Sequence, residues 1–273
     1  MTKSKIKTYS SVYSRNSAIK ILSKDFSFIN QMIKKYDEKF IDKTYLDYFK
    51  YIYKVLEKQY QNEYIYKNSF LNKYLIKNSS YLFSELKLGN NIVDLASFNE
   101  ISSAFEIKTH LDTKTRLNDQ INAYKKVFNE IYLIVPSSKV EEYLSFNSDV
   151  GIIDFPEFKI HRNPNLNFDI CPENIMQILH TKEYKNIVLE YFGYLPCINS
   201  FNQFKICGDM IKKIPSDKLS TLLIEQLKIR SYNEKLSIKN YKEFNQLFLS
   251  LKLDNAKRKA FINILKQSVL LTI

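Results

Sequence analysis

Tryptophan is absent from this sequence of 273 residues, and glycine, proline, cysteine and histidine are scarce, with 4, 6, 3 and 3 copies. No apolar run approaches the roughly 20 residues that a membrane-spanning helix needs, and no apolar segment follows the basic N-terminus as in a secretory signal. Cys171, Cys197 and Cys207 lie far apart without a Cys-x-x-Cys pair, which argues against a zinc knuckle and a disulfide framework. We therefore expect a protein of the reducing cytoplasm with no membrane contact.

The scarcity of histidine also limits the kind of metal site. A histidine-rich site would use nearly all of His110, His161 and His180, so any metal is expected to have oxygen ligands, which suit magnesium or manganese. Lys and Arg outnumber Asp and Glu by 41 to 29, for a net charge of +12. This excess favours a polyanionic partner such as nucleic acid, although a chain rich in Lys, Asn, Ile and Tyr acquires it from composition alone.

The spacing of apolar residues divides the chain into three regions. Residues 1–80 show helical spacing, and their largely aromatic stripes are expected to be core rather than a base-stacking surface. Residues 81–163 alternate between strand-like and helical segments, and residues 164–273 return to helix. We therefore predict a mixed α+β fold of the α/β kind, in which an αβββαβ core carries N-terminal helices and a helical C-terminal part.

Two strand-like segments in the central region are expected to form a hairpin. Residues 92–98 and 102–108 flank a candidate three-residue loop, Asn99-Glu100-Ile101. In that register Phe98 faces Ser102. A two-residue loop would slip the register by one residue, so the pairing depends on the loop length.

The same register places two carboxylates and an ammonium group on one face. Asp94 faces Glu106, and side-chain alternation puts Lys108 beside them. Two adjacent carboxylates repel each other unless a divalent cation neutralises them. Such a cation polarises a phosphodiester and activates water, Lys108 is placed to orient that water, and the backbone carbonyl of Ile107 offers another oxygen ligand. The alternative is an exposed charge cluster on a sheet face.

The Glu-x-Lys tripeptide is weak evidence by itself, because it occurs at residues 85–87, 106–108, 157–159 and 183–185. The first has no aspartate closely upstream, and the last lies in a helical pattern, where residues two apart point in different directions. Glu157 follows Asp154 too closely for a hairpin pairing, although Asp149 remains a possible partner. Only Asp94 with Glu106 has strand character on both sides.

A helix predicted over residues 112–129 supports the strand pair. Asp112 is expected to cap its start. Arg116, Gln120 and Tyr124 recur every four residues and form one polar stripe. Arg116 suits a phosphate group, and Gln120 suits a water molecule or DNA. The alternative is a solvated helix face.

This order of residues resembles the PD-(D/E)XK, or restriction-endonuclease-like, nuclease superfamily in its RecB-like branch. The match runs from Glu85 to Val135, about a fifth of the chain. Within it, the block Glu106-Ile107-Lys108, Asp112-Thr113, Arg116-Leu117, Gln120 and Tyr124 is similar to an uncharacterised bacterial family of that superfamily. Val93 stands where the superfamily name places a proline.

The resemblance implies a restriction-endonuclease-like fold and a magnesium- or manganese-dependent nuclease. It implies that Asp94 and Glu106 hold the metal, that Glu85 is the upstream acidic ligand, that Lys108 serves the attacking water and that Gln120 assists. The backbone carbonyl of Ile107 completes the expected metal ligands. The residues expected to contact nucleic acid, with DNA favoured over RNA, are Lys114, Arg116 and Tyr124.

Alternatives remain at this stage. A module of the same fold that binds nucleic acid without cleaving it would keep the basic surface and lose the chemistry. RNA is the alternative substrate, although no RNA-recognition motif is present. A homodimer is compatible with the sequence, and the basic run Lys257-Arg258-Lys259 is a candidate phosphate contact or a solvated face.

Overall fold

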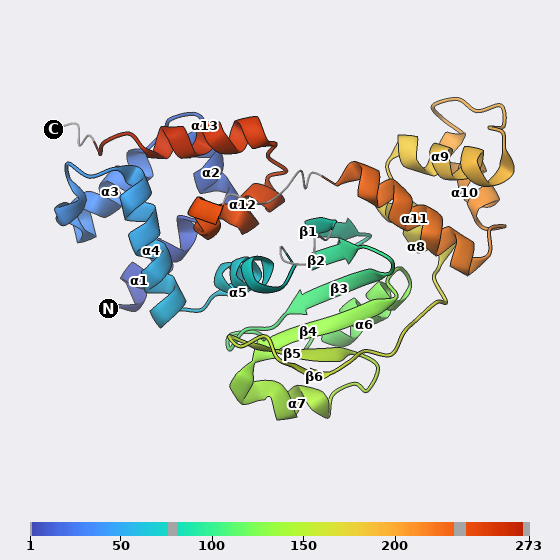
Figure 1. Ribbon diagram of the computed structural model, residues 1–273, viewed down its shortest axis with the longest axis horizontal. Coiled ribbons are helices and arrows are strands. Elements are labelled where there is room, and N and C mark those ends of the chain that lie inside the picture. Colours follow the sequence, from blue (N-terminus) through green and yellow to red (C-terminus); the bar gives the residue numbers. More distant parts are fainter. Residues whose placement is uncertain (1, 76–80, 232–238, 270–273) are drawn as a thin grey trace. The chain divides into compact units, whose positions relative to one another are not determined.

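The computed structural model describes residues 2–75, 81–231 and 239–269 (Figure 1). They form a mixed α+β fold, as predicted, in which a six-stranded mixed sheet is preceded and followed by helices along the chain. None of the helices in these ranges is long and apolar enough to cross a membrane.

The chain divides into two compact units. Unit 1 joins Met1–Ile76 to Tyr232–Ile273, and unit 2 is Lys77–Ser231. The predicted region boundary at residue 80 falls outside the described residues. The predicted C-terminal helical region, 164–273, contributes to both units, because contact between helices rather than position along the chain defines them.

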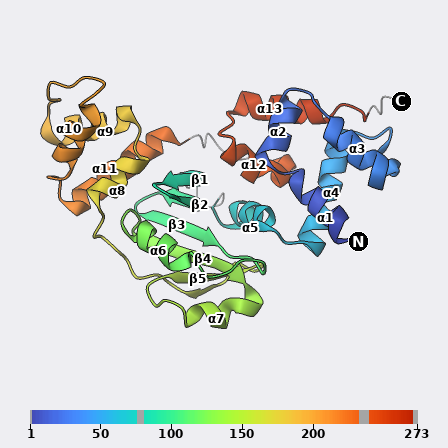
Figure 2. The ribbon, with the colours of Figure 1, turned by 180° about the vertical axis from the view of Figure 1, so that it is seen from behind.

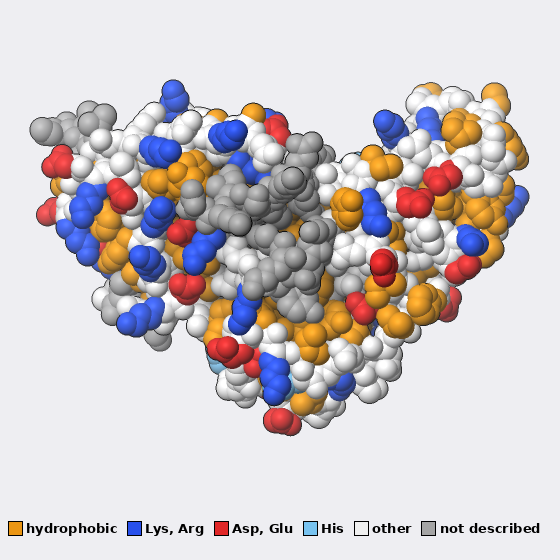
Figure 3. Space-filling view, viewed as in Figure 1, with side chains coloured by type: hydrophobic (Ala, Val, Ile, Leu, Met, Phe, Trp, Pro, Cys, Tyr) orange, Lys and Arg blue, Asp and Glu red, His pale blue; other side chains and the backbone are white. Residues whose placement is uncertain are grey.

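Unit 1 is helical and carries many lysine and arginine side chains, which are visible over the part that Figure 1 labels α3, α4 and α13 (Figure 3). The predicted aromatic stripe is confirmed as core, since α4 buries Tyr48, Phe49 and Ile52 completely. Its helices are α1 (Lys3–Ser11), α2 (Arg15–Leu22), α3 (Ser27–Tyr36), η1 (Glu38–Phe40), α4 (Tyr45–Gln59), α5 (Glu63–Phe70), η2 (Leu71–Leu75), η5 (Lys239–Phe244), α12 (Asn245–Ser250) and α13 (Asn255–Leu265).

Unit 2 contains a six-stranded sheet in the order β1-β2-β3-β4-β5-β6. Strands β1 to β3 are antiparallel, β3 to β5 are parallel, and β6 is antiparallel to β5. The strands are β1 (Leu82–Leu88), β2 (Asn91–Phe98), β3 (Ser102–Ile107), β4 (Glu130–Pro136), β5 (Gly151–Phe155) and β6 (Ile160–Arg162).

Helix α6 crosses one face of the sheet and connects the parallel strands β3 and β4 (Figure 2). On that face the paired Ala96 and Ala104 are small and completely buried, so the helix approaches the strands closely. The helices of unit 2 are α6 (Leu117–Lys125), η4 (Ser137–Lys139), α7 (Val140–Leu144), α8 (Pro172–Ile178), α9 (Thr181–Phe192), α10 (Gln203–Ile211) and α11 (Ser216–Arg230).

Two local predictions have different outcomes. The hairpin register is confirmed, because Phe98 pairs with Ser102 across the predicted three-residue loop. The helix predicted from residue 112 begins instead at Leu117. The Asp112 Oδ2 atom accepts hydrogen bonds from Thr109 N and Thr109 Oγ1, both at 2.7 Å, and so closes a turn after β3. A short polar side chain that bonds to nearby backbone competes with helix formation.

Candidate active site

Asp94 and Glu106 occupy neighbouring strands in the predicted register. Leu95 pairs with Phe105, and Asp94 and Glu106 are the next positions along β2 and β3. The Asp94 Oδ2 atom accepts a hydrogen bond of 2.8 Å from the backbone N–H of Ile107, which ties the aspartate to β3. The hairpin therefore brings the two predicted carboxylates together.

Four side chains form a closed hydrogen-bonded group that we call the Glu106 network: Glu106, Lys108, Gln120 and Tyr124. The Glu106 Oε1 atom accepts from Lys108 Nζ at 2.9 Å and from Gln120 Nε2 at 2.7 Å. The Lys108 ammonium also donates to Gln120 Oε1 at 3.0 Å. Tyr124 donates to Glu106 Oε2 at 2.7 Å, so both carboxylate oxygens are engaged.

Helix α6 supplies two members of the network, Gln120 and Tyr124, which face Glu106 on β3. Gln120 and Tyr124 are four residues apart, so they project from one side of the helix. Leu117 and Ile121 are completely buried and hold the helix against the sheet. The Tyr124 hydroxyl is also 2.9 Å from the carbonyl oxygen of Ile92. A phenol has one proton, so donation to Glu106 competes with donation to that carbonyl.

The environment of Glu106 favours its neutral form. The residue is 3% exposed. Burial, followed by the negative charge of Asp94, raises the pKa of Glu106 to about 7, although Lys108 and Tyr124 oppose this shift. Burial and the nearby Glu106 also hold the pKa of Tyr124 well above its ordinary value, so Tyr124 acts as a hydrogen-bond donor at neutral pH. A cation placed between Asp94 and Glu106 would reverse the balance at Glu106.

The oxygen donors of Asp94 and Glu106 suit a hard divalent cation. Within residues 2–75, 81–231 and 239–269, no three Asp, Glu, His or Cys side chains group as metal ligands, so Asp94 and Glu106 have no third such side chain beside them. Magnesium is commonly held by one or two carboxylates together with water and substrate phosphate. The pair therefore fits the predicted metal, with the Ile107 carbonyl as the neighbouring backbone oxygen.

Glu85, the predicted third acidic ligand, does not join the pair. It lies on β1 between the pairs Ser84↔Leu95 and Leu86↔Val93, and therefore opposite Asp94. However, its φ of 56° interrupts the regular strand, and its side chain is exposed. The regular alternation of side chains therefore does not hold at this residue, whose predicted role came from the family resemblance alone.

The three predicted nucleic-acid contacts have different surroundings. Arg116 is exposed at the start of α6. Lys114 pairs with Glu142 at 2.8 Å and lies 4.7 Å from the ring centroid of Tyr143. Tyr124 is completely buried, which corrects its predicted role: it holds Glu106 rather than a nucleic acid. The spacing of Tyr124 from Gln120 was the signal for this role, because it places both on the side of α6 that faces β3.

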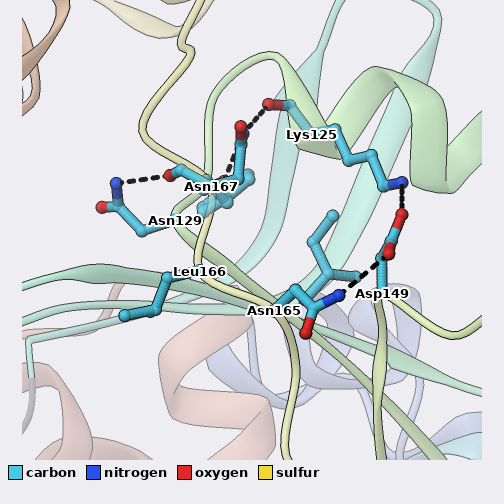
Figure 4. Close-up of a pocket in the computed structure, with 8 residues that line it drawn as sticks. Lys125, Asn129, Asp149, Asn165, Leu166 and Asn167 are labelled. Carbon is cyan, nitrogen blue, oxygen red and sulfur yellow. Dashed lines mark hydrogen bonds and ion pairs between the residues drawn. The ribbon is translucent and has the colours of Figure 1, made fainter.

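A pocket of about 190 Å³ lies away from this site, and none of the Glu106 network lines it. Its polar groups bond to one another (Figure 4): Lys125 Nζ lies 2.6 Å from Asp149 Oδ2, and Asn129 Nδ2 donates to Asn167 O at 2.9 Å. The first bond joins the end of α6 to the segment before β5, and the second joins the segment after β6 to the residue before β4. The polar groups that line the pocket therefore stabilise the structure of unit 2.

Comparison with known proteins gives one family match. The model of a family described as bacteriophage P4 protein cII matches residues 56–267. No curated protein matches. Among solved structures, the chain is similar to a protein of unknown function from Silicibacter pomeroyi, with 11% identity, 48% of this chain and 93% of the other covered, and a TM-score of 0.33. That likeness is too slight to support a conclusion.

Proposed function

The chain belongs to the bacteriophage P4 protein cII family, and from the geometry of its site we propose that it is a metal-dependent nuclease that hydrolyses phosphodiester bonds in DNA. The observation that carries the proposal is the convergence of Asp94, Glu106 and Lys108 from two paired strands, with Gln120 reaching them from α6. The proposal includes the resemblance to PD-(D/E)XK nucleases, in which these residue types act together.

The site residues have distinct roles in this proposal. Asp94 and Glu106 would hold magnesium or manganese, which supplies activation of a water molecule and polarisation of the phosphate. Lys108 keeps a positive charge beside Glu106 and is placed to orient the attacking water and stabilise developing negative charge. The side-chain amide of Gln120 bridges Lys108 and Glu106, accepting a hydrogen bond from the first and donating one to the second. Arg116, exposed at the start of α6, is the contact offered to phosphate.

The test is cleavage of labelled single-stranded DNA, duplex DNA and RNA with magnesium or manganese. We expect DNA cleavage by the wild type and loss of at least about 100-fold with Glu106→Ala or Lys108→Ala, in line with the loss of a preorganised catalytic group. A second Glu-x-Lys tripeptide gives a matched control, since Glu157 and Lys159 are both exposed. Glu157→Ala and Lys159→Ala should retain full activity; equal activity in all four variants contradicts the proposal.

One observation favours a second function, a module that binds nucleic acid without cleaving it. The Glu106 carboxylate is already engaged by Lys108, Gln120 and Tyr124, and in the described ranges no third metal-ligating side chain joins it and Asp94. Calorimetric titration with manganese separates the two functions. Manganese binding that Asp94→Asn weakens supports the nuclease, whereas DNA affinity without manganese binding supports the inert module.

Cellular setting and assembly are part of the same proposal. The three cysteines are free thiols, half-buried at Cys171, exposed at Cys197 and buried at Cys207, as expected for a protein of the reducing cytoplasm. A homodimer remains the proposed assembly, and light scattering of the purified protein tests it directly.

A further inference from the structure

The net positive charge of the chain resides in one of its two units. Unit 1 has 23 Lys and Arg against 10 Asp and Glu, a net charge of +13, whereas unit 2 has 18 against 19, a net charge of −1. The candidate active site belongs to unit 2. The unit proposed to carry the chemistry therefore has little overall attraction for a polyanion, and unit 1 supplies that attraction.

Within unit 1, helix α4 displays a stripe of three lysines. Lys50, Lys54 and Lys58 are separated by four residues each, so they lie along one side of the helix. Lys54 and Lys58 are exposed and Lys50 is half-buried. Among the described residues, none of the three forms an ion pair with a carboxylate. Like charges at this spacing destabilise a helix, so the stripe has a cost that no ion pair within the described residues offsets.

A fourth lysine extends the stripe from another part of the chain. Lys50 Nζ lies 5.4 Å from the ring centroid of Tyr241, and Lys266 Nζ lies 6.0 Å from the same ring. Tyr241 is half-buried, and Lys266 is exposed just after α13. The shared ring of Tyr241 thus places Lys266 near Lys50, the first lysine of the stripe. We call Lys50, Lys54, Lys58 and Lys266 the lysine face.

The basic run expected to contact phosphate is less suitable than the lysine face. Arg258 is 1% exposed and therefore belongs to the interior of unit 1. Lys257 lies 3.6 Å from the carboxylate of Asp254, which caps α13. Only Lys259 of the run remains exposed without such a pairing. The three residues are adjacent in sequence, but on α13 their side chains point in different directions and have different surroundings.

We infer that unit 1 is the nucleic-acid-binding part of the protein and that its lysine face binds the phosphodiester backbone. This inference rests on the proposed nuclease function and identifies the surface that binds the substrate. Lysine recognises phosphate as a point charge without reading the base, so the grip is independent of sequence. The exposed residues of α4 are Asp47, Lys54, Glu57, Lys58 and Gln59. None is apolar, which disfavours a membrane surface as the partner.

The test measures binding of the full chain to a labelled DNA oligonucleotide in EDTA, as single strand and as duplex, across a series of salt concentrations. The triple variant Lys50→Gln/Lys54→Gln/Lys58→Gln should lower the slope of log K against log salt by about 2 to 3 and weaken binding at least about tenfold at low salt. Glutamine favours helix as lysine does, and the like-charge repulsion disappears, so the variant should fold with undiminished thermal stability.

Two control variants make the result specific. Lys205→Gln/Lys213→Gln/Lys218→Gln removes three exposed lysines of unit 2 and reaches the same total charge, so it should bind nearly as the wild type does. Lys50→Arg/Lys54→Arg/Lys58→Arg keeps the charge and should retain the salt slope. Equal losses in the two glutamine variants overturn the lysine face, because only total charge would then matter.

Two further measurements separate this inference from others. If the α4 variant loses binding to phosphatidylserine vesicles but keeps its affinity for DNA, the partner is a membrane and the inference is wrong. Glu157→Ala, at an exposed residue of unit 2 outside the proposed site, should bind DNA as the wild type does. Lysine-dependent binding by a protein that cleaves nothing would leave this inference intact and contradict the nuclease alone.

Discussion

Glu106 couples the stability of the protein to pH. Its pKa of about 7 in the folded chain exceeds the ordinary value of 4.5, so the folded state binds the proton more tightly than the unfolded state. The stabilisation from neutral Glu106 is therefore complete below about pH 4.5 and is lost as the pH rises through 7. Above that pH, folding must bury a carboxylate beside Asp94.

We expect Glu106→Gln to remove this dependence, because the amide keeps one acceptor for Lys108 and Gln120 and has no charge to bury. Between pH 5 and pH 8, without metal, the free energy of unfolding of the wild type should fall by about 2 to 3 kcal/mol relative to the variant, at 1.36 kcal/mol per pKa unit. Urea unfolding in EDTA at several pH values measures this difference. Parallel pH profiles would show that Glu106 titrates normally.

The sequence predicted the positions of those site residues whose geometry is determined by neighbouring parts of the chain. Asp94, Glu106 and Lys108 come together because a three-residue loop and strand alternation determine which residues face each other. The position of Glu85 could not be predicted. Its positive φ breaks the alternation of side chains along β1, and a glutamate in the sequence gives no sign of that backbone conformation. Tyr124 was recognised as part of the stripe, but its burial depends on how closely α6 packs on the sheet.

At the scale of elements, the turn between β3 and α6 determines where the helix begins. Asp112 accepts two hydrogen bonds from Thr109, and the helix starts five residues later at Leu117. The sequence pattern indicated a helix from residue 112, because aspartate is both a good cap and a good turn residue. The apolar periodicity identified the helix and its buried side, but it could not tell whether Asp112 caps the helix or closes a turn before it.

Asp112→Ala should therefore disturb the placement of α6. Loss of the two bonds should lower the free energy of unfolding by about 1 to 2 kcal/mol. It should also reduce the proposed nuclease activity, because Gln120 and Tyr124 reach Glu106 only from a correctly placed helix. Chemical denaturation and DNA cleavage measure the two effects. Asn118→Ala, at an exposed position of the same helix, is the control. Full turnover in Asp112→Ala would show that the turn is not needed to position α6.

At the scale of the whole molecule, the two ends of the chain meet in unit 1. Val269 N donates to Lys43 O at 2.8 Å, Tyr45 N donates to Gln267 O at 3.1 Å, and Thr44 and Ser268 form a β-bridge. Val269 is 3% exposed. The sequence indicated helices at both ends, but not that they share one core, because such contacts join residues more than 200 positions apart.

Val269→Asp should destabilise unit 1 by about 2 to 4 kcal/mol, because it buries a carboxylate without a partner. Ser268→Asp adds the same charge at an exposed neighbour and should change stability little. Hydrogen exchange resolves the two units. Protection should fall in α1 to α4 and α13 of the Val269 variant and persist in β2 to β4. Uniform loss in both units would mean that they unfold together.

The meeting of both chain ends in unit 1 also sets an order of events during synthesis. Unit 2 is synthesised as one continuous stretch, Lys77–Ser231, whereas unit 1 also needs α12 and α13, which follow unit 2 along the chain. Domains tend to fold as units while translation proceeds. A nascent chain can thus complete the sheet of unit 2 and the candidate active site first, and unit 1 can assemble only after α12 and α13 have been synthesised.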